Sequence, residues 1–164
     1  HDISKCFLLD QEYEFGEDYA AKINDLQIMN KGFHSGCIDC VLPIGNTLED
    51  SKWWIIDWKS NFISGSDNSD CLPRNYIYEN LRNEMIKHHY PLQSHLYLLA
   101  LHRLLKWRIK NYQPHKHLGG YIYLFLKGLP DFELFEKSTS KDISPGIFIS
   151  KAPLKRINYL DNIF

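Results

Sequence analysis

The 164-residue sequence lacks the features of membrane, secreted and repetitive proteins. No apolar run approaches the roughly 18 to 20 residues that cross a bilayer, and no charged start precedes a short apolar core as in a signal peptide. There is no internal repeat and no low-complexity tract. Only four cysteines are present, and without a secretory signal they are expected to be reduced thiols. These absences predict a soluble, intracellular protein.

What the sequence does contain is enough apolar material for one folded domain. Hydrophobic residues make up 44% of the chain and aromatic residues 14%, which is typical of an ordered globular domain. We therefore predict a single domain over residues 1–164. The chain starts at His1 without an initiator methionine, which suggests either a fragment of a longer protein or processing.

Charge is balanced in total but not along the chain. The net charge of −1 argues, by itself, against a nucleic-acid partner, which usually meets a basic protein. Residues 1–73, however, hold 13 acids and 5 bases, whereas residues 74–117 hold 2 acids and 8 bases. The basic middle could follow a phosphate backbone or could simply be a solvated helical face. Its candidates for DNA contact are Arg103, Lys106 and Lys110.

The hydrophobic period changes near a loop at residues 64–70 that is rich in Ser, Gly, Asn and Asp. Alternating or continuous apolar runs predict strands at residues 6–15, 26–33, 36–42, 52–59 and 121–126. Helical spacing of apolar residues predicts helices at residues 75–89, 92–110 and 153–164. This order predicts an α/β sandwich around a mixed sheet.

The segment from Trp53 to Ser60 places an acid and a base two residues apart at the end of an apolar strand. Because strand side chains alternate, Asp57 and Lys59 should point the same way and Trp58 the opposite way. A carboxylate and an ammonium beside apolar residues need a partner, which can be each other, a metal or a substrate. A structural ion pair is therefore the plain alternative to a functional site.

A second acid, Asp39, lies in the β-prone run at residues 36–42. A hairpin of this spacing could bring Asp39 beside Asp57. Two carboxylates next to a lysine suit Mg²⁺, which takes oxygen ligands and keeps several waters. Such an ion supports hydrolysis of a phosphodiester, while the lysine neutralises developing charge and helps to hold the attacking hydroxide.

A third element comes from the predicted helix at residues 92–110. Gln93 and Tyr97 are four residues apart and so share one helix face. A glutamine facing the acid pair could orient water or a scissile phosphate. The alternative is an amphipathic core helix that tolerates two polar residues.

Taken in order, these segments resemble the nuclease domain of the RecB family, within the PD-(D/E)XK nuclease superfamily. The resemblance covers residues 36–128 and rests on four motifs: Gly36-x-Ile38-Asp39, Ile56-Asp57-Trp58-Lys59-Ser60-Asn61, Tyr90-x-Leu92-Gln93-x-x-Leu96-Tyr97 and His117-x-Gly119-Gly120. It implies a restriction-endonuclease-like fold, with a mixed central β-sheet flanked by α-helices. It also implies that the chain is a Mg²⁺-dependent exodeoxyribonuclease domain of a RecBCD-type helicase–nuclease, acting in double-strand break repair and recombination.

The resemblance assigns roles to five of these residues. Asp39 and Asp57 match the metal-binding aspartates of the family, and Lys59 matches its catalytic lysine. Gln93 and Tyr97 match the Q-x-x-x-Y motif of this nuclease branch.

Two further positions concern the N-terminal part of the family pattern. Glu12 falls roughly where the family has an additional acidic metal ligand, although Glu14 would share its face of a strand. The upstream histidine ligand of the family has no match, because His1 is too close to Glu12. We therefore expect a nuclease domain truncated at its N-terminus, from a longer helicase–nuclease subunit.

The cofactors and partners implied by the resemblance are Mg²⁺, with Mn²⁺ as a substitute, double- and single-stranded DNA, and RecC- and RecD-like subunits in the bacterial cytoplasm. ATP would serve only the helicase part of the parent protein. Two alternatives remain open: a non-catalytic DNA-binding or subunit-docking module, and a stand-alone nuclease of the same superfamily.

The remaining motifs favour structural roles. Cys37 and Cys40 would face opposite sides of a strand, which argues against one shared metal ion. His117, just before a double glycine, is expected to orient the next strand.

Overall fold

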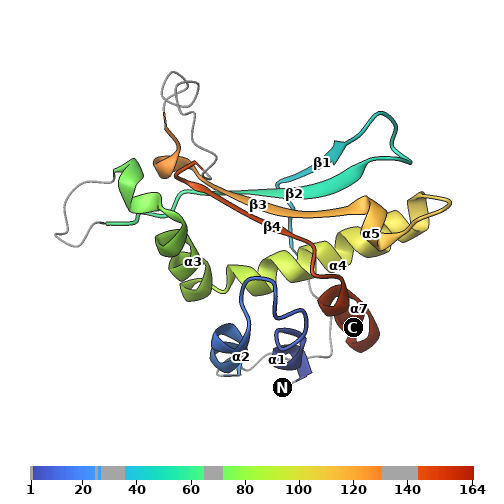
Figure 1. The fold of residues 1–164 in the computed structure, drawn as a ribbon, viewed down its shortest axis with the longest axis horizontal. Coiled ribbons are helices and arrows are strands. Elements are labelled where there is room, and N and C mark those ends of the chain that lie inside the picture. Colours follow the sequence, from blue (N-terminus) through green and yellow to red (C-terminus); the bar gives the residue numbers. More distant parts are fainter. Residues whose placement is uncertain (1, 25, 27–35, 65–71, 131–143) are drawn as a thin grey trace.

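The computed structural model describes residues 2–24, 26, 36–64, 72–130 and 144–164. Its centre is a four-stranded sheet with the strand order β1-β2-β3-β4 (Figure 1). The strands are β1 (Cys40–Ile44), β2 (Lys52–Lys59), β3 (Leu118–Phe125) and β4 (Ile147–Lys151). The β2/β3 pair is parallel and the two outer pairs are antiparallel, so the predicted mixed sheet is confirmed.

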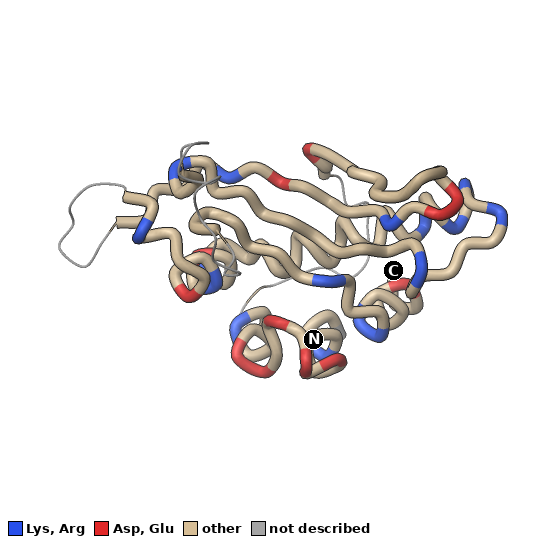
Figure 2. The backbone as a smooth tube through the Cα atoms, turned by 45° about the horizontal axis from the view of Figure 1, so that its top comes forward, with Lys and Arg blue, Asp and Glu red and all other residues tan. Residues whose placement is uncertain are grey.

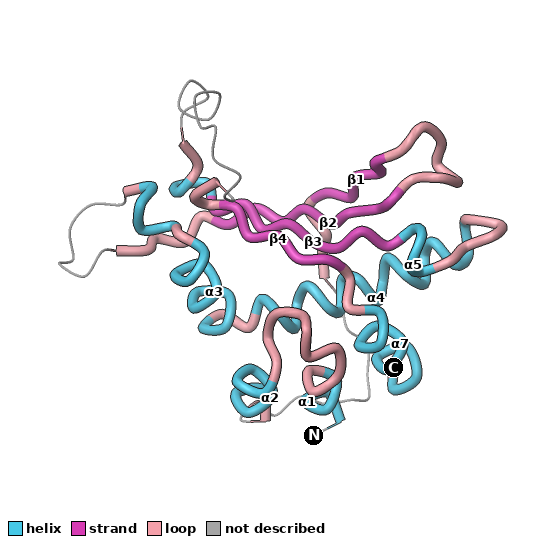
Figure 3. Tube along the Cα trace, in the orientation of Figure 1, coloured by secondary structure: helices cyan, strands magenta, loops and turns pink. Residues whose placement is uncertain are grey.

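Helices lie below one face of this sheet. They are α1 (Asp2–Cys6), α2 (Glu17–Ile23), α3 (Tyr78–Lys87), α4 (Tyr90–Arg108), α5 (Pro114–His117) and α7 (Leu154–Ile163), with 3-10 turns η1 (Pro73–Tyr76) and η2 (Leu126–Gly128). The long helix α4 runs under the sheet, and α1, α2 and α7 lie on the far side of α4 (Figures 1 and 3). None of the helices in the described ranges is long and apolar enough to span a membrane.

The two faces of the sheet differ in what covers them. The inner face, toward α4, carries fully buried side chains such as Ile55, Tyr123 and Phe148. On the outer face, Ile44 is 55% exposed and Trp58 is 43% exposed. Figure 3 shows no described helix over this outer face.

Two adjacent glycines let the strands approach each other at the start of β3. A Cβ atom on Gly119 would lie 2.4 Å from the indole nitrogen of Trp54, and one on Gly120 would lie 2.0 Å from the carbonyl oxygen of Ser150. The β2/β3 register shifts at this point, between Trp53 and Trp54. The double glycine of the His117 motif is therefore required by close packing, of Gly119 against the Trp54 side chain and of Gly120 against the backbone of β4.

A buried arginine ties the N-terminal loop to the last helix. The Arg156 guanidinium donates hydrogen bonds to the carbonyl oxygens of Leu9 and Glu14, both at 2.8 Å. The Asp10 carboxylate accepts a 2.8 Å hydrogen bond from the backbone N–H of Lys155, in the first turn of α7. It thereby satisfies a donor that no residue within the helix can bind, and it places a negative charge at the helix N-terminus.

These tertiary contacts explain why the strand predicted at residues 6–15 is wrong. The segment forms the end of α1 and a series of turns, in which Asp10 and Phe15 have φ angles of 48° and 64°. Its carbonyl oxygens bind Arg156 instead of a neighbouring strand. Local β-propensity is weak compared with such contacts.

The bounds of the other predicted elements agree more closely with the structure. The strand at residues 52–59 is confirmed to the residue as β2, and the three predicted helices correspond to α3, α4 and α7. The strand predicted at 36–42 begins later, at Cys40, and the strand predicted at 121–126 begins earlier, at Leu118. Most of the segment predicted at 26–33 lies outside the described residues.

Candidate active site

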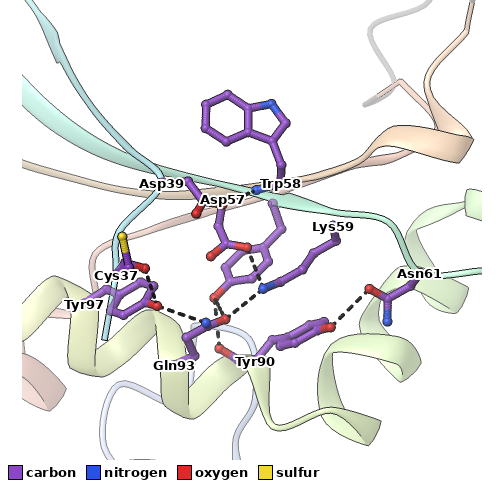
Figure 4. A network of polar contacts seen from close by, with 10 residues as sticks. Cys37, Asp39, Asp57, Trp58, Lys59, Asn61, Tyr90, Gln93 and Tyr97 are labelled. Carbon is purple, nitrogen blue, oxygen red and sulfur yellow. Dashed lines mark hydrogen bonds and ion pairs between the residues drawn. The ribbon is translucent and has the colours of Figure 1, made fainter. Parts of the chain in front are cut away.

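The centre of the site is an ion pair on the inner face of β2. The Lys59 ammonium nitrogen lies 2.6 Å from Asp57 Oδ2, and the Asp57 side chain is only 3% exposed. Trp58, between them, points to the opposite side of the strand (Figure 4). The predicted alternation of Asp57, Trp58 and Lys59 is therefore confirmed.

Burial raises the pKa of Asp57 above its usual value, and the nearby Asp39 charge adds to the rise while Lys59 opposes it.

The β1/β2 hairpin brings the second carboxylate to the same place. Cys40 pairs with Ile56, so Asp39 lies just beyond the strand end, next to Asp57. Asp39 Oδ2 accepts a 3.0 Å hydrogen bond from the backbone N–H of Trp58. Asp39 is exposed whereas Asp57 is buried, so the two carboxylates form one site that is open on the side of Asp39.

The amide of Gln93 links Lys59 to the segment before β1. Lys59 Nζ donates to Gln93 Oε1 at 3.1 Å, Gln93 Nε2 donates to Tyr97 Oη at 3.1 Å, and Tyr97 Oη donates to the Cys37 carbonyl oxygen at 2.6 Å (Figure 4). An ammonium can only donate, and the single Tyr97 hydroxyl proton is already used. Lys59 and Tyr97 therefore require the same orientation of the Gln93 amide, with Oε1 toward Lys59 and Nε2 toward Tyr97.

Two tyrosines form an aromatic wall around the lysine. Lys59 Nζ lies 4.1 Å from the centre of the Tyr90 ring and 5.2 Å from that of Tyr123. The rings of Tyr90 and Tyr123 stack on each other with centroids 5.6 Å apart. A cation over aromatic faces is attracted by their quadrupoles, so the wall favours a charged Lys59 at this position.

A second polar network starts at the Tyr90 hydroxyl. Tyr90 Oη donates to Asn61 Oδ1 at 3.1 Å, and Asn61 Nδ2 donates to Glu84 Oε1 at 2.9 Å. Glu84 also contacts His88 Nε2 at 2.8 Å and Lys87 Nζ at 3.4 Å. These hydrogen bonds and ion pairs lower the pKa of Glu84 although burial opposes them. The network holds α3 against the end of β2 beside the ion pair.

The donor set of the site fits a hard divalent cation. Asp39 and Asp57 offer carboxylate oxygens, and within the described ranges no cluster of three or more His, Cys, Asp or Glu side chains forms a closed metal site. Mg²⁺ is commonly held by one or two carboxylates while it keeps several waters. A cation between the two carboxylates would also relieve the repulsion that contributes to the raised pKa of Asp57.

Glu12 is not brought to these residues. It is exposed in the loop that joins α1 to α2, two helices that lie beyond α4 from the sheet (Figure 1). The strand on which it was expected is absent from this described segment. A metal-binding role for Glu12 stays a prediction that depends on the resemblance alone.

The predicted DNA-contacting bases lie at the C-terminal end of α4 and just after it. Arg103 Nε lies 2.6 Å from Asp161 Oδ1, and Lys106 Nζ lies 3.8 Å from Asp161 Oδ2. Lys110 is exposed in the turn that follows α4. Because Asp161 of α7 partly neutralises the first two charges, DNA contact by this end of α4 stays a prediction.

The acids of the N-terminal segment are also distributed differently from the segment totals. Many of them lie on α2 and the loop before it, on the far side of α4 from the sheet (Figure 2): Asp10, Glu12, Glu14, Glu17 and Asp18. Arg82 of α3 binds both Glu14 and Asp18. The acidic total of residues 1–73 therefore does not describe the electrostatic field at the Asp57 site.

The cysteine and histidine motifs have structural roles in the described residues. Cys37 and Cys40 are free thiols, and Cys37 serves the site through its backbone carbonyl. His117 Nε2 contacts the Glu49 carbonyl oxygen at 2.9 Å, and its Nδ1 accepts a 2.9 Å hydrogen bond from Gln113 N–H. His117 thus anchors the start of β3 to the β1/β2 hairpin, as expected.

Sequence reasoning missed the roles of Tyr123, Tyr90 and Asn61, although Tyr90 and Asn61 stand in the quoted motifs and Tyr123 in the strand predicted at residues 121–126. Tyr90 precedes Gln93 by three residues, so helical spacing alone could have placed it on the same face. Tyr123 pairs with Asp57 across β2 and β3, and no sequence pattern reveals that parallel register.

A mixed sheet with helices under it, and an acid–lysine pair at the end of its second strand, define a restriction-endonuclease-like domain. The chain is 35% identical over 134 residues, 82% of its length, to the RecBCD enzyme subunit RecB of Buchnera aphidicola subsp. Baizongia pistaciae. It is 38% identical over 99 residues, 60% of its length, to RecB of Escherichia coli strain K12, and 37% identical over 99 residues to RecB of Mycolicibacterium smegmatis. No family model matches the chain.

The resemblance to RecB that the sequence motifs predict is confirmed by these relatives. The matched residues make up about a tenth of the length of these relatives, between 8% and 10%. The similarity therefore concerns one region of a much larger subunit.

Proposed function

We propose that this chain is a nuclease domain of a RecB-type subunit and that it hydrolyses DNA phosphodiester bonds with Mg²⁺, for which Mn²⁺ can substitute. The observation that carries the proposal is the contact of Lys59 with both Asp57 and Gln93, beside the exposed carboxylate of Asp39. A structural ion pair needs neither the second carboxylate nor the glutamine. The similarity to RecB supports the choice of a nuclease.

In this proposal Asp39 and Asp57 hold the metal ion. A bound Mg²⁺ supplies positive charge to the phosphate oxygens and makes water more acidic. Lys59 has three ammonium protons, of which two face Asp57 and Gln93, and the third can reach a phosphate oxygen or the attacking water. Gln93 and Tyr97 keep the ammonium in place, so that it stabilises the transition state without reorganising.

For the whole protein we propose an exodeoxyribonuclease that works within a RecBCD-type helicase–nuclease during double-strand break repair. Its partners would be double- and single-stranded DNA and RecC- and RecD-like subunits. ATP would be consumed by the helicase part and not by this domain.

The test is a DNA hydrolysis assay of the full-length protein that carries these residues, with and without Mg²⁺. Asp57→Asn keeps the size of the side chain but removes a ligand charge, and we expect the rate to fall by about a thousandfold, which corresponds to several kcal/mol of transition-state stabilisation. The matched control is Asp50→Asn, which neutralises an exposed aspartate in the β1/β2 hairpin and should leave the rate unchanged. Equal rates for wild type and Asp57→Asn contradict the proposal.

A second candidate, a subunit-docking module without activity, is favoured by the apolar side chains exposed on the outer face of the sheet, such as Ile44 and Trp58. Titration with Mn²⁺ separates the two functions. Binding that disappears in Asp39→Asn supports the nuclease, whereas an absence of binding supports the docking module.

A further inference from the structure

We propose that Tyr123 is a positioning residue of the nuclease site, which acts on Lys59 through the amide of Gln93. The inference rests on the nuclease function proposed above and adds to it a residue of β3. In the register of the sheet, Tyr123 is the direct partner of Asp57 on the neighbouring parallel strand. Both side chains therefore stand on the inner face, side by side, and Tyr123 is completely buried there.

The Tyr123 hydroxyl has a defined acceptor. It lies 3.0 Å from Gln93 Oε1 and 3.3 Å from the carbonyl oxygen of Tyr90. Tyr90 begins α4, so its carbonyl lies where an intrahelical hydrogen bond can satisfy it. A hydroxyl has a single proton, and the shorter contact assigns that proton to Gln93.

Gln93 Oε1 thus accepts two hydrogen bonds, one from Lys59 at 3.1 Å and one from Tyr123 at 3.0 Å. The other end of the amide donates to Tyr97. Three neighbours on three different elements hold this one amide in a single orientation. The long side chain of Lys59 has many rotamers. On the side of α4, Gln93 accepts its hydrogen bond and the Tyr90 ring lies against its ammonium group.

The hydroxyl of Tyr123 is a dependable donor. Burial, with the charge of Asp57 as a second cause, raises the pKa of Tyr123 well above that of an ordinary tyrosine. The group therefore keeps its proton at neutral pH. Loss of the hydroxyl would leave a lone pair of Gln93 Oε1 without a partner in a partly buried site and would free the amide to move.

The reaction rate depends on where the Lys59 ammonium group lies and not only on its charge. A displacement of about 1 Å in a catalytic group can lower a rate by about a hundredfold. An ammonium that drifts away from the Asp57 side of the site no longer reaches the same phosphate oxygen. The role of Tyr123 is thus expected in kcat and not in the binding of DNA.

The test is Tyr123→Phe in the full-length protein, because this variant keeps the ring beside Lys59 and removes only the hydroxyl. We expect kcat to fall by about tenfold with KM unchanged. The matched control is Tyr121→Phe, which removes a hydroxyl from an equally buried tyrosine on the same face of β3, near Ser94 and Ser150. Both variants should lose similar stability, but only Tyr123→Phe should lose kcat.

A mutant cycle separates positioning from a general structural role. In a Gln93→Ala background the residue through which Tyr123 acts is gone, so Tyr123→Phe should change kcat by less than about twofold. A tenfold loss in both backgrounds overturns the proposal, because the effect of Tyr123 would then not pass through Gln93. Equal kcat values for wild type and Tyr123→Phe overturn it as well.

A crystal structure of each variant provides a readout that does not depend on activity. In Tyr123→Phe we expect the distance from Lys59 Nζ to Gln93 Oε1 to exceed the hydrogen-bond limit of about 3.5 Å, and in Tyr121→Phe we expect it to stay at its wild-type value. An unchanged contact in Tyr123→Phe contradicts the positioning role. A wild-type protein without nuclease activity would refute the proposed function, and the crystal structures would still decide whether Tyr123 positions Lys59.

Discussion

The inner and outer faces of the sheet are built from the same strands but differ in chemistry. On β2, the inward side chains include Ile55, Asp57 and Lys59, and the outward ones include Ile56 and Trp58. The inner face contains charged and hydroxyl groups that are buried and paired. The outer face is almost wholly apolar although it is partly exposed.

This difference shows where the fold can support chemistry. Buried polar groups require complete sets of partners, and the inner face provides them through α3, α4 and β3. When one face of a sheet is exposed to solvent, the side chains on that face are usually polar. Here the apolar side chains of Leu42, Trp58 and Ile149 are exposed instead. Such an apolar surface is typical of a protein contact. The catalytic proposal therefore concerns the inner face, and the docking candidate concerns the outer face.

The largest expected difference between the faces is in stability. Phe148 and Ile149 are neighbours on β4, but Phe148 is fully buried against Phe15 and Tyr121 whereas Ile149 is 37% exposed. We expect Phe148→Ala to lower the free energy of unfolding by about 3 to 5 kcal/mol, and Ile149→Ala to lower it by about 1 kcal/mol or less. Denaturant unfolding of both variants measures the two values. Equal losses would show that the outer face is packed as tightly as the inner one.

A second effect, which depends on pH, is expected from His95, a buried histidine of α4 that contacts Phe7 and Tyr121. Burial lowers the pKa of His95 from 6.5 to about 3, and its Nδ1 lies 2.6 Å from the Pro91 carbonyl oxygen. Between these two pH values the unfolded chain binds a proton that the folded chain does not. The free energy of unfolding should therefore fall as the pH is lowered from 6.5 toward 3, by about 1.4 kcal/mol per pH unit from this group.

The measurement is denaturant unfolding between pH 7 and pH 4, compared for wild type and His95→Gln. The variant should lose stability less steeply with falling pH, whereas the exposed His115→Gln should follow the wild type. Identical slopes for His95→Gln and wild type would show that His95 takes up a proton in the folded chain.

The smallest effect is predicted for Trp58, the outward neighbour of the ion pair. Its backbone N–H binds Asp39, but its side chain points away from the site (Figure 4). Trp58→Thr keeps a strand-forming residue and should change the free energy of unfolding by about 1 kcal/mol or less, with no change in DNA hydrolysis. A large loss of hydrolysis in a variant that folds normally would mean that the outer face takes part in the chemistry.

Much of the site could be predicted from the sequence because its parts lie close together in the chain. The period of a strand puts Asp57 and Lys59 on one side, and the period of a helix puts Gln93 and Tyr97 on one face. Hairpin spacing was sufficient to bring Asp39 beside Asp57. The strand predicted at residues 6–15 failed because its conformation depends on Arg156, far along the chain.

By itself, then, the sequence indicated the mixed α/β class, the shared side of Asp57 and Lys59, and the shared helix face of Gln93 and Tyr97, since these follow from short-range periodicity. The RecB resemblance rests on the order of the motifs. The tertiary structure decided which partners complete the acid–lysine–glutamine set. The parallel register of β2 and β3 places Tyr123 beside Asp57, and the helix packing brings Gln93 to Lys59. It also decided which face of the sheet is covered, because burial depends on contacts between distant segments that no local pattern specifies.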